Sequence, residues 1–143
     1  LDSINISCND LNWFRSYLYD RKQCVRIDSK CSSWCSLSAG VPQGGVLSPL
    51  LFSIFINSLT DLLSLSFHLY ADDLQIYTST SVDDISGAIT RLNSDLNLIS
   101  SWSKSSGLSI NASKSQVILI GSRQQISKVS FSSLPSVVFD GAI

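Results

Sequence analysis

Apolar positions recur at helical spacing in the first half of the chain. Asn9 or Asp10 can cap a helix whose apolar stripe ends near Tyr19. A second helix is predicted to start at Ser48-Pro49, with serine as N-cap and proline at the first helical position, and to run to about residue 63. Six residues give this second helix a broad apolar face: Leu51, Ile54, Phe55, Ser58, Leu59 and Leu62.

A longer amphipathic stripe lies in the second half of the chain. Ser81 and Asp84 have the spacing of a capping box, and Gly107 is a natural helix stop because glycine tolerates the left-handed conformation. Between them we expect one long helix. Its apolar face is predicted to hold Ile85, Ile89, Leu92, Leu96, Ile99 and Trp102.

Several short stretches have the pattern of β-strands. Residues 23–28 and 34–38 predict one hairpin, and residues 67–70 and 74–78 predict another around the turn Ala71-Asp72-Asp73. Residues 117–120 are all apolar and predict a buried strand. Further candidate strands are 129–131 and 137–139, the latter leading into a turn signal at Asp140-Gly141.

The order helix, hairpin, helix, hairpin, helix, strand predicts an α+β fold. The chain has 143 residues, 44% of them hydrophobic and 15% charged, which is typical of a folded chain and excludes a disordered one. One domain over residues 1–143 is therefore the working expectation. The absence of methionine and the abrupt ends indicate a piece of a longer protein.

Charge is unevenly distributed along the chain. The net charge of −1 shows no basic excess of the kind typical of an autonomous nucleic-acid binder. Between residues 31 and 100 only Arg91 is basic, against six aspartates, whereas five cations lie earlier: Arg15, Arg21, Lys22, Arg26 and Lys30. An acidic middle beside basic flanks suits a cation site between nucleic-acid-facing edges. Ordinary solvated surface charge explains the pattern equally well.

Cysteine usage and hydropathy point away from secretion and from membranes. The four cysteines lack the spacing of a zinc site and His68 is the only histidine, so we expect free, partly buried thiols. With no signal peptide, an intracellular protein, nuclear or cytoplasmic, is expected. The apolar run 46–69 is interrupted by Pro49, Asn57 and Asp61, which favours a buried helix over a membrane span.

Asp72 and Asp73 are consecutive acids between two apolar strands. Burial of such a pair without a partner would be costly. A Mg²⁺ or Mn²⁺ ion, which prefers hard oxygen ligands, would offset that cost. An Asp-Asp pair in a turn is also commonplace, so the pair alone does not distinguish a metal site from an ordinary turn.

Two longer motifs shift that balance. Tyr70-Ala71-Asp72-Asp73 matches the Tyr-x-Asp-Asp box of reverse transcriptases. Upstream, the segment GVPQGGVLSPLLF at residues 40–52 closely resembles the glycine-rich loop and following helix of the same family. The order and spacing of the two motifs also fit, and the overall pattern resembles the reverse transcriptases of non-LTR (LINE-type) retrotransposons.

The resemblance implies RNA-directed DNA polymerase activity by two-metal nucleotidyl transfer to a primer 3′ hydroxyl, with Mg²⁺ or Mn²⁺ held by Asp72 and Asp73. It implies a partial polymerase palm, with a ferredoxin-like sheet and helices, and a small fingers-derived segment. The implied partners are an RNA template, a DNA primer and a deoxynucleotide.

By the same resemblance, the glycine-rich loop shapes the nascent base-pair pocket, and Tyr70 and Ala71 are further candidates for substrate or template binding. Gly44 and Gly45 lack side chains, so backbone can approach a base pair closely, and Gln43 supplies an amide. A plain helix-capping loop would explain Pro42 and the later serine and proline. It leaves the adjacent glycines and the glutamine without a role.

Two further segments extend the resemblance over residues 11–120. Residues 107–114 (GLSINASK) resemble the stretch after the long palm helix, where a lysine lies near the triphosphate. Lys114 is thus the candidate for charge stabilisation or proton donation to pyrophosphate, a solvated lysine being the ordinary alternative. Residues 11–18, followed by Arg21 and Lys22, also resemble the LINE-type pattern, and these two cations are candidates for phosphate contact.

One element of the family's site is not recognised. The first metal-binding aspartate of the family lies on a strand upstream of the Trp13 helix, and nothing before Asn9 resembles that strand. We therefore expect the isolated chain to lack polymerase activity, with the thumb and any endonuclease also outside it. The alternatives are a decayed or domesticated relic, acting at most as a nucleic-acid or protein binding module, and an intron-type reverse transcriptase. The intact motifs argue against long decay, and residues 13–18 favour the retrotransposon.

Overall fold

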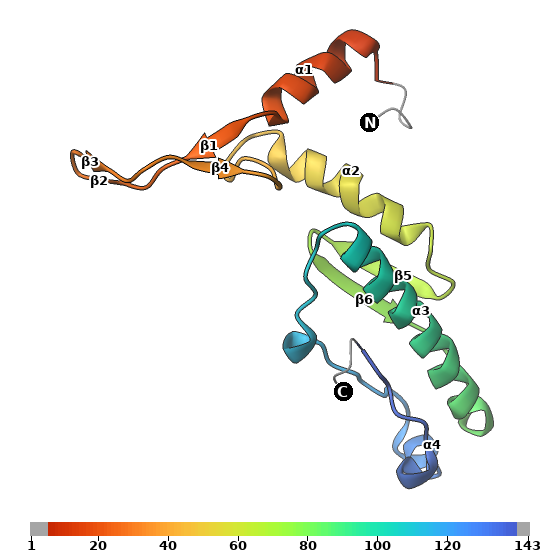
Figure 1. Cartoon of the computed structure of the whole chain (residues 1–143). Helices are drawn as coiled ribbons and strands as arrows, with labels where there is room; N and C mark the ends of the chain where they lie inside the picture. The colour runs from red at the N-terminus through yellow and green to blue at the C-terminus, as the bar shows by residue number, and fades with distance from the viewer. Residues whose placement is uncertain (1–5, 140–143) are drawn as a thin grey trace. The chain divides into compact units, whose positions relative to one another are not determined.

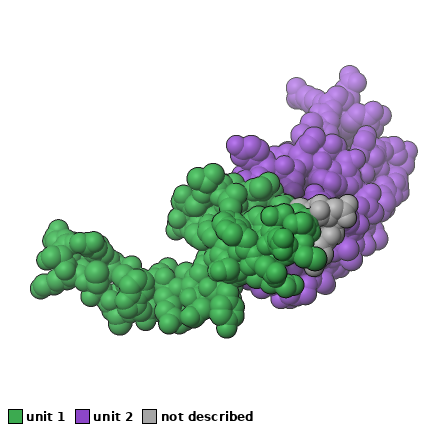
Figure 2. Space-filling model, turned by 90° about the horizontal axis from the view of Figure 1, so that it is seen from above, with its two compact units in different colours: residues 1–55 green, residues 56–143 purple. Residues whose placement is uncertain are grey.

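The computed structural model describes residues 6–139, which belong to two compact units. Residues 1–55 form the first unit and residues 56–143 the second (Figure 2). Helices and short two-stranded antiparallel sheets make up the chain (Figure 1), which agrees with the predicted α+β class. None of the described helices has the length and apolar character needed to cross a membrane.

The first helix, α1, spans Cys8–Leu18 and is capped two or three residues earlier than the sequence indicates. Ser7, not Asn9 or Asp10, is the N-cap, and its hydroxyl oxygen accepts a hydrogen bond from the backbone N–H of Asp10 at 3.4 Å. The predicted end near Tyr19 is confirmed, since Tyr19 is the C-cap.

The first predicted hairpin is confirmed and forms a slender two-stranded arm, residues 21–37 (Figure 1). At its base β1 (Arg21–Gln23) pairs with β4 (Cys35–Leu37), and at its tip β2 (Arg26–Ile27) pairs with β3 (Lys30–Cys31). All four cysteines are free as predicted, but only Cys24 is half-buried and the other three are exposed. Cys31 and Cys35 lie on the arm, and a two-stranded ribbon has too little depth to bury them.

Helix α2 spans Ser48–Thr60 and begins differently from the prediction. The Leu51 N–H donates to the Leu47 carbonyl at 2.9 Å, so helical bonding starts at Leu47. The Ser48 hydroxyl donates to the Pro42 carbonyl and is not available as an N-cap. The helix ends three residues before the predicted position 63. Only part of its apolar face is buried, because Leu51 and Leu59 are enclosed while Phe55 is 42% exposed.

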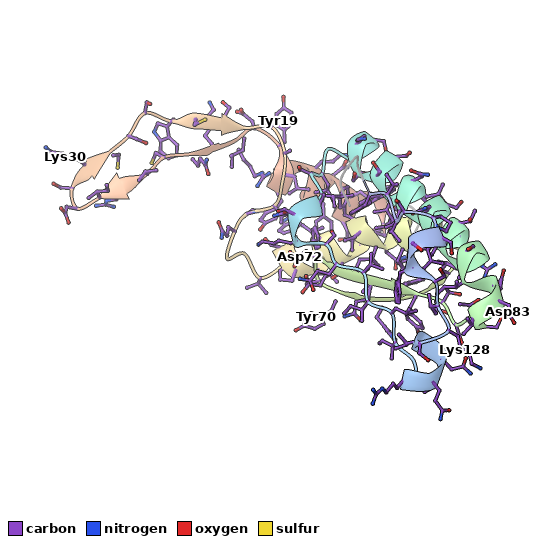
Figure 3. The ribbon with its side chains drawn as sticks, turned by 90° about the horizontal axis from the view of Figure 1, so that it is seen from below. Tyr19, Lys30, Tyr70, Asp72, Asp83 and Lys128 are labelled. Atoms are coloured by element: carbon purple, nitrogen blue, oxygen red, sulfur yellow. The ribbon has the colours of Figure 1, made fainter. Side chains whose placement is uncertain are left out.

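The second predicted hairpin is confirmed in the second unit. Strand β5 (Ser66–Tyr70) pairs with β6 (Asp73–Tyr77), and Tyr70 stands opposite Asp73, which leaves a two-residue turn. Side chains alternate strictly, since one face is exposed and the other, half-buried, holds Phe67, Leu69, Leu74 and Ile76. Helix α3 (Ile85–Ser105) lies alongside this hairpin (Figures 1 and 3).

The start of α3 differs from the predicted capping box. A 3₁₀ turn, η2 (Val82–Asp84), precedes the helix, and the Ser81 side chain makes no capping hydrogen bond. The Asp84 carboxylate instead pairs with Arg91 at 3.0 Å. The predicted stop at Gly107 is confirmed: its φ is +70°, and the Leu108 N–H donates to the Ser103 carbonyl at 2.9 Å, as in a Schellman motif.

A fully buried carboxylate joins α3 to the chain that enters β5. Asp95 accepts hydrogen bonds from the backbone N–H groups of Ser64 (3.0 Å) and Leu65 (2.9 Å) and from the Ser64 hydroxyl (2.8 Å). Close by in the fold, the Trp102 indole N–H donates to the Ser58 hydroxyl at 3.1 Å, linking α3 to α2. These polar bonds fix the two helices and the hairpin of the second unit together.

The strands predicted after α3 are not formed. Residues 117–120 have no regular secondary structure and are exposed, with Ile118 at 74% and Ile120 at 88%, because no strand of the described chain pairs with them. Residues 129–131 run into a 3₁₀ turn, η4 (Phe131–Ser133), and residues 137–139 show only an isolated bridge at Phe139. The predicted turn at Asp140-Gly141 lies outside the described residues. The remaining elements are short: η3 (Ala112–Lys114) and α4 (Arg123–Ile126).

Candidate active site

The Tyr70-Ala71-Asp72-Asp73 segment forms the closed end of the β5–β6 hairpin (Figure 3). Ala71 and Asp72 are the two turn residues, and Ala71 has φ +52°. A left-handed residue at the first turn position matches the twist of a tight hairpin but favours glycine. For alanine this conformation costs about 1 kcal/mol. The hairpin therefore holds its turn, and the acids on it, in a conformation set by strand pairing.

Both carboxylates of the turn are exposed to solvent. The expected burial cost is therefore absent in this chain, and the argument that burial itself requires a metal ion is wrong here. Their chemistry still fits a divalent ion: two hard oxygen donors from adjacent residues, on a rigid turn with open space around them. Among residues 6–139 no group of three or more acidic, histidine or cysteine side chains comes together. The turn thus carries two exposed carboxylates on consecutive residues.

The exposed face of the hairpin carries further side chains that lie outside the Tyr-x-Asp-Asp motif. Strand alternation places His68, Gln75 and Tyr77 on the same exposed face as Tyr70 and Asp73. The rings of His68 and Tyr77 stack across the strands, with centroids 5.1 Å apart. Tyr70 is 83% exposed. The alternation of polar and apolar residues along both strands is the sequence feature that identifies these residues.

The glycine-rich loop, Gly40–Gly45, lies in the first unit. Its last turn is closed by the Gly45 N–H, which donates to the Pro42 carbonyl at 3.1 Å, and by the Ser48 N–H, which donates to the Gly45 carbonyl at 3.1 Å. Gln43 is exposed, and its side-chain amide makes no hydrogen bond to any described residue. The loop thus presents Gln43 outward from a turn that is itself bonded.

The two adjacent glycines of this loop meet different requirements. Gly44 has φ +79°, and a Cβ added there would meet nothing within 4 Å, so backbone conformation requires glycine while its surroundings are open. A Cβ on Gly45 would lie 2.8 Å from the Ser48 Oγ and 2.9 Å from the Tyr17 hydroxyl. Gly45 therefore makes room for the protein's own side chains, whereas Gly44 leaves backbone open to an approaching molecule.

The two cations proposed for phosphate contact lie in different surroundings. The Arg21 guanidinium donates to the carbonyls of Leu18 (3.2 Å), Ala39 (3.4 Å) and Gly40. Lys22, next to it on β1, is exposed. The Nε and Nη2 donors of Arg21 are thus occupied within the protein, and Lys22 is the more exposed of the two cations.

Lys114 is exposed at the end of η3 and does not join the carboxylates of the turn. Its backbone N–H donates to the Asn111 carbonyl at 3.1 Å, and within residues 6–139 its side chain forms no ion pair with Asp72 or Asp73. One turn therefore carries Tyr70, Ala71 and both aspartates. The glycine-rich loop is a separate feature of the first unit.

Comparison with known proteins gives consistent matches. A family model described as reverse transcriptase (RNA-dependent DNA polymerase) matches residues 2–134. The RNA-directed DNA polymerase from mobile element jockey of Drosophila melanogaster is 30% identical over 117 residues, covering 76% of this chain and 13% of that protein. The probable RNA-directed DNA polymerase from transposon BS of the same species is 34% identical over 109 residues, covering 70% and 12%.

A third relative, the polymerase from mobile element jockey of Drosophila funebris, is 35% identical over 108 residues, covering 70% of this chain and 12% of that protein. The chain thus spans about an eighth of the length of these curated relatives. No solved structure matches.

Proposed function

This chain belongs to the reverse transcriptase (RNA-dependent DNA polymerase) family, and from that membership we propose that it is the part of a LINE-type RNA-directed DNA polymerase that carries the catalytic turn. The mobile-element relatives confirm the resemblance to the retrotransposon enzymes. The parent protein would join the 3′ hydroxyl of a DNA primer to the α-phosphate of a deoxynucleotide on an RNA template, releasing pyrophosphate.

The observation that carries the proposal is the turn itself, with Asp72 and Asp73 exposed side by side at the end of a paired hairpin. We propose that both carboxylates hold Mg²⁺ or Mn²⁺, with Asp72 as the principal ligand. When bound, the ion would stabilise the negative charge that develops on the phosphate oxygens. The paired strands keep the two acids fixed, so little reorganisation is needed on binding.

The remaining assignments concern the substrates. Pro42, Gln43, Gly44 and Gly45 would form one wall of the nascent base-pair pocket, since the open surroundings of Gly44 admit a close approach. Tyr70 and Ala71 would lie beside the primer end. Lys114 would offset charge on the departing pyrophosphate; its exposure leaves its ammonium group accessible.

For the whole chain we propose a partial reverse transcriptase domain over residues 1–143. The second unit, with α3 alongside the β5–β6 hairpin, would be part of the palm, and the first unit would include a fingers-derived segment. On the arm, Lys22, Arg26 and Lys30 are exposed and carry charge suited to phosphate oxygens of a template or primer.

The test is Asp72→Asn in the full-length parent, assayed by primer extension on an RNA template. Loss of a metal-ligating charge at an exposed turn is expected to abolish extension while leaving circular dichroism and the thermal midpoint unchanged. Asp83→Asn, at an exposed aspartate of η2, is the matched control and should retain wild-type turnover. The isolated 143 residues are expected to give no extension.

Wild-type turnover by Asp72→Asn would overturn the assignment. A parent that binds template and primer but gives no extension, even as the wild type, would support the alternative of a retroelement relic that acts as a nucleic-acid binding module.

A further inference from the structure

Arg21 occupies an unusual position for a cation on an exposed arm. Its guanidinium donates to three backbone carbonyls that come from two separate segments: Leu18 at the end of α1, and Ala39 and Gly40 at the start of the glycine-rich loop. The planar guanidinium suits this task because its five N–H donors point in fixed directions. One side chain thus fixes where the loop leaves the arm.

The far end of the same loop is held by Ser48. Its side chain is buried, and its hydroxyl donates to the Pro42 carbonyl, so the first residue of α2 is bonded to the middle of the loop. The absence of a side chain at Gly45 makes this bond possible, because an added Cβ would lie 2.8 Å from the Ser48 Oγ.

Between these two anchors the loop exposes only part of itself. Gly40, Gln43 and Gly44 are exposed, whereas Val41, Pro42 and Gly45 are half-buried. Gly40 is bonded to Arg21 through its carbonyl, so Gln43 and Gly44 are the two exposed loop residues that neither anchor bonds to. A flexible loop of this size would lose conformational freedom on binding a ligand, and a loop ordered beforehand avoids that cost.

We propose that Arg21 and Ser48 are positioning residues, which together hold the Gly40–Gly45 loop so that Gln43 and Gly44 are presented in one conformation. The consequence for nucleotide binding rests on the proposed polymerase function. The anchoring itself does not, and the two are tested separately.

The anchoring is tested by hydrogen–deuterium exchange on the 143-residue chain. Ser48→Ala removes the bond to Pro42, and Arg21→Ala removes the bonds to Leu18, Ala39 and Gly40. Each is expected to speed exchange of the Gly45 and Ser48 amides, whose N–H groups donate to the Pro42 and Gly45 carbonyls of the loop, by about tenfold, because local opening loses hydrogen bonds of a kind worth that factor or more. Ser48→Thr and Arg21→Lys, which keep a donor, should restore part of the protection.

Matched controls are available on the same elements. Ser53→Ala removes a hydroxyl that bonds only within α2, to the Pro49 carbonyl at 2.9 Å, and Arg26→Ala removes a guanidinium that bonds to the Asp28 carbonyl at the arm tip. Both should leave exchange of the Gly45 and Ser48 amides at the wild-type rate. Wild-type exchange in Ser48→Ala and Arg21→Ala would overturn the proposal. If Arg21→Ala loses its helical circular dichroism signal, that variant is unfolded, and the amide exchange of Ser48→Ala and Arg21→Lys tests the proposal in its place.

The functional consequence is tested by steady-state primer extension with the full-length parent. Loss of either anchor is expected to raise the KM for deoxynucleotide about tenfold. We expect kcat to stay within about twofold and the Kd for primer–template to change little, since the loop meets one nascent base pair and the rest of the primer–template duplex lies away from it. Faster exchange without a change in KM would overturn the positioning role. An inactive wild-type parent would instead refute the polymerase function and leave the exchange result standing.

Discussion

Aspartate residues of the second unit occupy two opposite environments. Asp95 is completely buried and accepts three hydrogen bonds, so its charge is matched by donors within the protein. Asp72 and Asp73 are exposed at a turn and have no such donors among the described residues. The first arrangement stabilises a fold, whereas the second leaves carboxylate oxygens available to a ligand.

This contrast gives a prediction for Asp95→Asn. The Ser64 and Leu65 N–H groups both bond to one carboxylate oxygen, whose place the amide oxygen can take, but these bonds lose their charge and the NH₂ group faces the Ser64 hydroxyl in place of an acceptor oxygen. The free energy of unfolding should fall by about 2 kcal/mol, as measured by urea denaturation of the 143-residue chain. Asp83→Asn on the exposed η2 turn is the control and should change it by less than about 0.5 kcal/mol. Equal stability of the two variants would contradict this account of Asp95.

The sequence around Asp95 indicates that its carboxylate is buried but does not identify its hydrogen-bond partners. Asp95 falls three residues after Leu92 and four before Ile99, within the apolar stripe of α3, and a lone acid in such a stripe is the signal of a buried hydrogen-bonded carboxylate. Its partners, Ser64 and Leu65, lie some thirty positions away in sequence, at separations of 31 and 30. No local pattern identifies partners at that distance.

At the scale of elements, the sequence predicted correctly those helix ends and turns that depend on residues close in sequence. The end of α1, both hairpins and the Gly107 stop depend on neighbouring residues, and all are confirmed. The predicted caps at Ser48 and Ser81 are wrong, in the first case because the Ser48 hydroxyl finds a partner outside its helix, at Pro42. Residues 117–120 need a distant partner strand, which composition cannot supply. Sequence motifs identify the aspartate turn and the glycine-rich loop. The hydrogen bonds of Arg21 to residues distant in sequence are visible only in the structure.

The segment at residues 136–138 illustrates how a side chain can replace strand pairing. Asn93 of α3 donates its amide N–H to the Ser136 carbonyl at 2.9 Å and accepts the Val138 N–H at 3.0 Å. The side-chain amide thus bonds to this backbone as a neighbouring strand would. The predicted strand at 137–139 is held on a helix instead of in a sheet.

Asn93→Ala should therefore release this segment from α3. Both hydrogen bonds are lost, so limited proteolysis with a protease of broad specificity is expected to cleave near residues 134–138 several-fold faster than in the wild type. Asn97→Ala, at an exposed asparagine of the same helix, should leave the rate unchanged. Equal cleavage of the Asn93 variant and the wild type would show that other contacts hold the segment.

At the scale of the whole molecule, the chain exposes apolar surface. Its curated relatives are much longer and have additional sequence that can cover such a surface. The chain spans about an eighth of the length of these relatives. Four consecutive apolar residues at 117–120 are exposed, and their backbone groups form no hydrogen bonds within the described part of the chain. Such a segment is a template for pairing with another copy, and a net charge of −1 provides little repulsion.

The isolated chain is therefore expected to self-associate, and Ile118→Lys combined with Ile120→Lys should suppress this. The double variant changes the net charge from −1 to +1, so the magnitude of the net charge is unchanged while two apolar side chains are lost from the segment. Sedimentation velocity across a concentration series measures the association. Gln116→Lys with Gln124→Lys makes the same charge change at exposed polar positions and should associate like the wild type. If both double variants are equally monomeric, charge and not the 117–120 segment governs association.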